Sequence, residues 1–162
     1  MKKLFVLAAA LSMAALAQDS KPNFSGAWEL VVDKCDFGQA PESGPRFPDR
    51  IDARTDVVDH KDPSLKVTIK AKTPQGDMTQ ERNWMTNGQE VTEDLQGSPL
   101  KSRTRWVGKE LLTESTLASD HGEAKIVIRW QLSDNGKTLT TVRSIKSDSG
   151  EMKQTLVFVK KS

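Results

Sequence analysis

The stretch Asn-Phe-Ser-Gly-Ala-Trp-Glu-Leu-Val-Val, residues 23–32, determines how the rest of the chain is organised. Phe24, Gly26 and Trp28 alternate along it, as residues on one face of a β-strand do. Gly26 lets the backbone pass close to a neighbouring segment, and Trp28 supplies a large apolar side chain with one N–H donor. We expect this strand to be the first of a long antiparallel series whose last member returns to pair with it.

Short runs with strand character follow one another to the end of the chain, and turn sequences separate them. Asn87-Gly88 is the strongest of the hairpin signals, because both residue types tolerate positive φ. Residues 34–49 are rich in Gly and Pro, which favours an extended loop. The expected strands cover residues 25–33, 50–60, 65–72, 78–86, 89–95, 101–107, 110–118, 123–133, 137–147 and 151–160.

The hydrophobic period inside these runs is two. Leu65, Val67 and Ile69 fall on one face of their strand, and lysines and a threonine fall on the other. A flat sheet of this size would leave two open edges and one large apolar face, and closure removes both. The pattern predicts an all-β fold, an antiparallel up-and-down β-barrel of about 8–10 strands with no helical lid.

The Phe24, Gly26 and Trp28 motif resembles the entry motif of the calycin barrels, which include the lipocalins and the intracellular fatty-acid-binding proteins. Residues 155–160 are similar to the final strand of the fatty-acid-binding proteins. The resemblance implies a calycin-like barrel that holds a small ligand, with Trp28 as a structural residue at its floor. That family holds a ligand carboxylate with an Arg and a Tyr on the final strand, but Leu156 and Phe158 occupy the matching positions here. From the motif alone, Trp28 could equally belong to the core of a β-sandwich.

The first 17 residues have the pattern of a cleaved signal peptide. Lys2 and Lys3 precede an apolar run that ends in Ala-Leu-Ala at residues 15–17. We expect residues 18–162 to form one domain of a periplasmic or secreted protein, monomeric and without a transmembrane segment in the mature chain. Without Lys2 and Lys3, basic and acidic residues are equal in number, so charge gives no reason to expect nucleic acid as a partner.

Polar residues interrupt the apolar face in the middle of several strands. Gln80 and Arg82, for example, share a face with Met78 and Trp84. Apolar ends with polar middles are typical of a barrel that encloses a hydrated cavity. A β-bulge could instead turn such residues outward, and surface ion pairing is the alternative role of the arginines. The candidate ligand-binding residues are Met78, Gln80, Arg82, Trp84, Trp106, Trp130, Thr141, Arg143 and Gln154.

No pattern in the sequence indicates catalysis or metal binding. His60 and His121 both fall at expected turns, so we expect them to be solvated loop residues. Neither has a second histidine or a cysteine at ligand spacing, so we expect no metal, no cofactor and no enzymatic activity. Cys35 is the only cysteine, which excludes an internal disulfide. We expect its thiol to be buried and inert, and the alternative is a thiol available for intermolecular pairing.

These observations favour an extracytoplasmic protein that holds a small, largely apolar molecule in its barrel. The alternative is an exported protein-interaction or inhibitor module with a filled barrel, which contacts its partner through residues 34–49. Phe37, Arg46 and Phe47 would then form the contact surface. An open interior supports the first hypothesis, and a packed interior with exposed loop aromatics supports the second.

Overall fold

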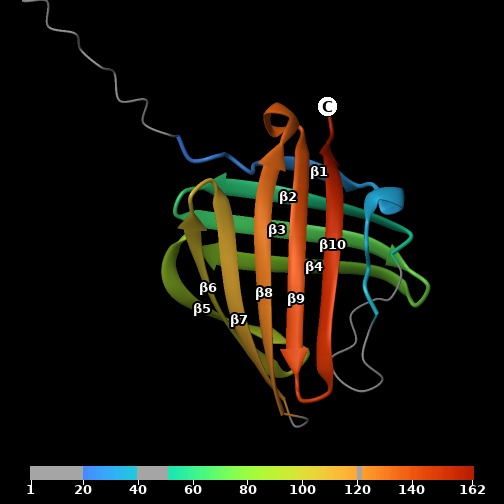
Figure 1. The fold of residues 1–162 in the computed structure, drawn as a ribbon, viewed down its shortest axis with the longest axis vertical. Helices are drawn as coiled ribbons and strands as arrows, with labels where there is room; N and C mark the ends of the chain where they lie inside the picture. The colour runs from blue at the N-terminus through green and yellow to red at the C-terminus, as the bar shows by residue number, and fades with distance from the viewer. Residues whose placement is uncertain (1–19, 40–50, 120–121) are drawn as a thin grey trace, which may run out of the picture.

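The computed structural model describes residues 20–39, 51–119 and 122–162. Ten strands form one antiparallel sheet in the order β4-β3-β2-β1-β10-β9-β8-β7-β6-β5, and Figure 1 shows β2 to β4 crossing behind β7 to β10. The only helical segments in the described ranges are two short 3-10 turns, Val32–Lys34 and Asp134–Gly136, so the predicted all-β antiparallel barrel is confirmed. The strands are β1 (Gly26–Leu30), β2 (Ala53–Lys61), β3 (Ser64–Thr73), β4 (Gly76–Met85), β5 (Asn87–Leu95), β6 (Ser98–Val107), β7 (Glu110–Ser119), β8 (Gly122–Ser133), β9 (Thr138–Ser147) and β10 (Gly150–Lys160).

The first strand pairs with the last, as expected. Trp28 lies opposite Lys160, and Leu30 lies opposite Phe158. The first strand is shorter than predicted, because the chain turns into the 3-10 segment at Val32 instead of continuing to Asp33. The pairing of β1 with both β2 and β10 leaves β4 and β5 as the two ends of the sheet.

The tight hairpin predicted at Asn87-Gly88 is wrong. β4 ends before these residues and β5 already includes them, and β4 and β5 do not pair with each other. Thr86 explains the difference, because its N–H donates to the carbonyl of Pro63 at 2.8 Å and its hydroxyl donates to Asp62. These bonds hold the chain against the β2–β3 turn, so β5 does not fold back along β4.

The interior of the barrel follows the predicted alternation. Leu65, Val67 and Ile69 of β3 are buried, and the residues between them face outward. Trp28 is fully buried, and its indole N–H donates to the carbonyl of Phe24 at 2.9 Å. The first tryptophan therefore has the structural position that the sequence predicts for it.

Cys35 lies half-buried beside β10. Its thiol donates to the carbonyl of Val31 at 3.2 Å and accepts from the N–H of Val157 at 3.4 Å. Burial raises the pKa of the Cys35 thiol, more than the hydrogen bond from Val157 and the nearby Arg54 lower it. Because the thiolate is the reactive form, these surroundings favour an inert cysteine.

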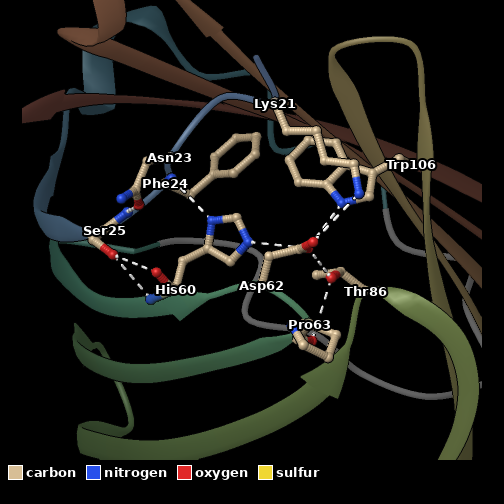
Figure 2. Close-up of polar contacts among 9 residues, drawn as sticks. All are labelled: Lys21, Asn23, Phe24, Ser25, His60, Asp62, Pro63, Thr86 and Trp106. Carbon is tan, nitrogen blue, oxygen red and sulfur yellow. Dashed lines mark hydrogen bonds and ion pairs between the residues drawn. The ribbon is translucent and has the colours of Figure 1, made fainter. Parts of the chain in front are cut away.

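His60 is not the solvated residue that its position before a turn predicts. It lies near the end of β2, only 6% exposed, beneath the segment that precedes β1. Figure 2 shows the ring of Phe24 beside it, and the Phe24 N–H donates to His60 Nδ1 at 3.3 Å. The prediction is wrong because residues distant in sequence cover this turn, whereas His121 lies outside the described residues.

Asp62 is the shared partner of several polar side chains at this end of the barrel (Figure 2). Its Oδ1 accepts from the Thr86 hydroxyl and from the indole N–H of Trp106, the latter at 3.0 Å. Its Oδ2 lies 3.3 Å from Nζ of Lys21. The hydrogen bond from Thr86, followed by that from Trp106, lowers the pKa of Asp62 to about 2.

Replacing Trp28 should destabilise the barrel strongly. In Trp28→Ala we expect the free energy of unfolding, measured by urea denaturation, to fall by about 3–5 kcal/mol, because a fully buried aromatic side chain is lost. Val57→Ala is the matched control on the neighbouring strand, since Val57 is 45% exposed, and should change stability by no more than about 0.5 kcal/mol. Equal losses in the two variants would contradict the structure.

Asp62 should make the fold acid-sensitive. Its pKa is lower in the folded state than in the unfolded chain, so its contribution is complete above about pH 4 and is lost as the pH falls towards the folded value. Thermal unfolding between about pH 5 and pH 2 should show this loss in the wild type and a flatter profile in Asp62→Asn. Asp59→Asn, an exposed site on β2, should keep the wild-type profile.

Candidate functional site

A row of inward-facing residues crosses the barrel wall at mid-height. In this row Thr104 lies opposite Thr113, which lies opposite Ile128. The row continues through Arg143 to Gln154 on the last strand. The described ladders place Arg143 and Gln154 on the inner face, as the sequence pattern predicts.

The small hydroxyl side chains in the barrel wall form hydrogen bonds with one another. The hydroxyls of Thr104 and Thr113 lie 2.8 Å apart, and those of Ser102 and Ser115 also lie 2.8 Å apart. All four residues are buried. These groups therefore need no ligand to complete their hydrogen bonds.

Arg54 and Asp56 of β2 form a buried ion pair that the sequence analysis missed. Arg54 Nε and Nη2 each donate to one carboxylate oxygen of Asp56, both at 2.7 Å. The guanidinium carbon of Arg54 also lies 5.4 Å from the ring centroid of Phe158 on β10. The spacing in the sequence could have revealed this pair. Arg54, Asp56 and the buried Val58 are two positions apart, so all three lie on one face of the strand.

Arg82 and Glu93 face each other across the unpaired β4 and β5. Arg82 Nη1 lies 3.7 Å from Glu93 Oε2, and the two side chains are 11% and 13% exposed. The backbone N–H of Asn83 donates to the same carboxylate at 2.9 Å. Burial lowers the pKa of Arg82, and Glu93 partly offsets this. Arg82 therefore faces inward as predicted, and side chains hold the two unpaired strands together.

Arg143 lies within electrostatic range of both pairs. Its pKa is lowered to about 10, first by burial, then by repulsion from Arg54 and Arg82, and Asp56 opposes this. The cluster of Arg54, Asp56, Arg82, Glu93 and Arg143, called here the arginine cluster, contains three cations and two carboxylates. Among the described residues the cluster brings three guanidinium groups together on the inner face, and positive charges that converge where the dielectric is low attract an anion.

The side chains of the arginine cluster are not all fully buried. Arg143 faces inward but is only half-buried, and the side chains of Arg54 and Arg82 each retain 11% exposure. Exposed area on an inward-facing side chain borders space that a water-sized molecule can reach. The arrangement can therefore receive a polar group from a ligand as well as attract it.

The other predicted residues divide between two places. Trp84 and Trp130 are buried and meet edge to face, with ring centroids 5.8 Å apart, and the indole nitrogen of each has no hydrogen-bond partner among the described residues. Trp106 lies apart from the arginine cluster, at the end of the barrel, where it binds Asp62. The remaining positions line β4 and β9: Met78, 36% exposed beside Ala71; Gln80, half-buried beside Ile69; and Thr141, buried beside Trp130.

The described residues contain neither a cluster of metal-ligating side chains nor a membrane-spanning helix. Within residues 20–39, 51–119 and 122–162, no group of three or more His, Cys, Asp or Glu side chains could hold a metal ion. In the same ranges, no helix has the length and apolar character needed to cross a bilayer. We take the arginine cluster as the candidate functional site because it gathers charged side chains on the inner face.

Arg143 should reduce the stability of the free protein. Replacing it with methionine removes a half-buried charge that two neighbouring cations repel, so we expect the free energy of unfolding of Arg143→Met to equal or exceed that of the wild type. Arg129→Met is the control, because Arg129 is 51% exposed and pairs with Glu110 on the outside of the sheet. Urea denaturation at neutral pH tests this, and a large loss of stability in Arg143→Met alone would contradict it.

The sequence matches no protein-family model and no curated protein, but the structure resembles solved β-barrels. A secretory abundant heat soluble protein from Ramazzottius varieornatus has a TM-score of 0.60 at 14% identity, covering 85% of this chain and 94% of that chain. The zebrafish ileal bile acid-binding protein, complexed with cholic acid, has a TM-score of 0.52 at 14% identity, covering 85% of this chain and 98% of that chain. The fatty acid transporter REP1-NXSQ has a TM-score of 0.51 at 16% identity, covering 85% of this chain and 97% of that chain. In fold, this chain is a calycin-like β-barrel, with ten antiparallel strands that nearly close on themselves.

Proposed function

We propose that this protein binds a small, largely apolar molecule with an acidic group, and that it holds this molecule inside the barrel without reacting with it. The observation that carries the proposal is the convergence of three mutually repelling arginines on the inner face. A carboxylate, sulfonate or similar group beside Arg143 would offset the repulsion from Arg54 and Arg82. Charge-assisted hydrogen bonds to such a group are among the stronger ones in proteins.

The rest of the inner face suits an apolar body. Ile126, Ile128 and Ile145 surround the arginine row on β8 and β9, and all three are buried. Trp84 and Trp130 provide aromatic surface next to them. Mostly apolar walls with a few convergent polar groups are typical of small-molecule sites.

The structural neighbours support this proposal through their own ligands. One similar barrel is a bile acid-binding protein in complex with cholic acid, and another is a fatty acid transporter. Both names describe molecules that combine an apolar body with an acid. The three arginines of the cluster lie on β2, β4 and β9, whereas Leu156 and Phe158 of β10 are apolar, so the proposed contact uses different strands from those of the fatty-acid-binding proteins.

An exported location is part of the proposal. The signal-peptide pattern at residues 1–17 supports it, and those residues lie outside the described ranges. The single domain expected over residues 18–162 includes the whole barrel.

The interaction-module alternative receives less support. Phe37, one of its two aromatic contact residues, is half-buried and packs against the core instead of projecting outward. Arg46 and Phe47 lie outside the described residues. We therefore retain ligand binding as the proposed function.

A pair of fluorescent probes tests the proposal. Anilinonaphthalene sulfonate is apolar and anionic, whereas Nile red is apolar and neutral. We expect Arg143→Met to weaken binding of the anionic probe about 10-fold or more, since a charge-assisted contact is lost, and to leave the neutral probe unaffected. Arg129→Met, on the outer face, should change neither affinity. Absence of saturable binding of both probes, or equal weakening of both by Arg143→Met, would overturn the proposal.

A further inference from the structure

His60 joins the segment before β1 to the end of the barrel, as Figure 2 shows. Its backbone N–H donates to the Ser25 hydroxyl at 2.9 Å, and its carbonyl accepts from the same hydroxyl at 3.1 Å. Its ring Nδ1 accepts from the backbone N–H of Phe24 at 3.3 Å. Because Nδ1 is an acceptor, the single proton of the neutral ring lies on Nε2.

Phe24 covers the aromatic residues at this end of the barrel. It is fully buried, and its ring centroid lies 5.9 Å from that of His60 and 6.1 Å from each of those of Trp106 and Trp130. Its carbonyl accepts from the indole N–H of Trp28 at 2.9 Å. The backbone of Phe24 is thus held on one side by His60 and on the other by Trp28.

Two charged groups face the His60 ring. Nε2 is buried without a hydrogen-bond partner among the described residues and lies 3.8 Å from Asp62 Oδ1, which is too far for a hydrogen bond. Lys21, on the segment before β1, pairs with the other oxygen of Asp62. Burial lowers the pKa of His60, Asp62 opposes this, and Lys21 adds a small further lowering. The ring is therefore neutral at physiological pH.

We propose that His60 is a pH-sensitive latch that holds Phe24 over the end of the barrel and releases it when the ring takes up a second proton. A doubly protonated ring carries N–H groups at both nitrogens, so Nδ1 can no longer accept from Phe24. Two donors then face each other, and the buried Phe24 amide loses its partner. Attraction to Asp62 draws the charged ring away from Phe24 as well.

The latch is closed at high pH and opens in acid. Because the pKa of His60 is lower in the closed form than in an open one, protons bind preferentially to the open form as the pH falls below about 6.5. Release of Phe24 uncovers Trp106 and Trp130. If the barrel holds an acidic ligand, as the proposed function states, release of Phe24 also lets that ligand leave the barrel faster. Only this consequence rests on the proposed function.

Hydrogen exchange at the Phe24 amide tests the latch without any ligand. In the wild type, the protection factor should fall between about pH 7.5 and pH 5, by up to about tenfold per pH unit, the limit for one proton. His60→Asn should remove this dependence, because the asparagine Oδ1 occupies the position of Nδ1, accepts from Phe24 and does not titrate. His121→Asn, which changes the second of the two histidines, should retain the wild-type profile.

Two further measurements keep the test decisive if His60→Asn folds poorly. Proton–nitrogen NMR of the wild-type imidazole should show the Nε2-protonated form at neutral pH and a titration that coincides with the loss of Phe24 protection. In Asp62→Asn the midpoint should move to lower pH, because a carboxylate that favours the charged ring is gone. A protection profile that is independent of pH, or unchanged in His60→Asn, would overturn the latch.

The ligand step has a separate readout. After a pH jump from about 7.5 to about 5, dissociation of anilinonaphthalene sulfonate from the wild type should accelerate by up to about tenfold per pH unit, the same limit as for Phe24 exchange. Dissociation from His60→Asn should not accelerate. If the probe fails to bind at any pH, the proposed function fails, but the Phe24 exchange experiment still decides the latch. If the probe binds and Phe24 protection is constant, the latch alone fails.

Discussion

The antiparallel pairing of β1 with β10 is the contact on which the rest of the structure depends. These strands come from opposite ends of the chain, and only their pairing turns a linear meander into an enclosed interior. Gly26 favours the approach, because its φ of +140° is one that other residues rarely adopt. A Cβ at this position would also lie 2.7 Å from Cε of Lys160 and would make that flexible side chain move. Without this closure, the arginines of β2, β4 and β9 would not share a common space.

The strands and their faces could be predicted from the sequence because both depend on local order. A period of two has only two registers, and one apolar residue on each strand decides between them. Ile145 thus places Arg143 on the inner face, and Leu156 does the same for Gln154. The positions of the turns follow for a similar reason, since Gly, Pro, Asn and Asp act over a few residues.

The features that the sequence did not reveal depend on contacts between distant residues. The Asn87-Gly88 signal describes what two residues prefer, but Thr86 is bonded to the β2–β3 turn more than 20 positions earlier. His60 is buried by a phenylalanine 36 positions before it. Glu93 has an exposed neighbour, Asp94, and its role is evident only once Arg82 is known to face it. Local patterns predict which face a residue occupies, but not what lies against that face.

The two polar clusters of the barrel differ in how their charges are satisfied. At the barrel end, Asp62 has several donors and sits partly in solvent, which stabilises its charge. In the interior, three arginines share two carboxylates, and the pKa of Arg143 records the cost. A barrel selected for stability alone would place an apolar residue at Arg143, since Ile128 flanks it. On the proposed function, an acidic group beside Arg143 would offset this repulsion. We therefore expect the stability of the free protein and the affinity for such a ligand to oppose each other at this side chain.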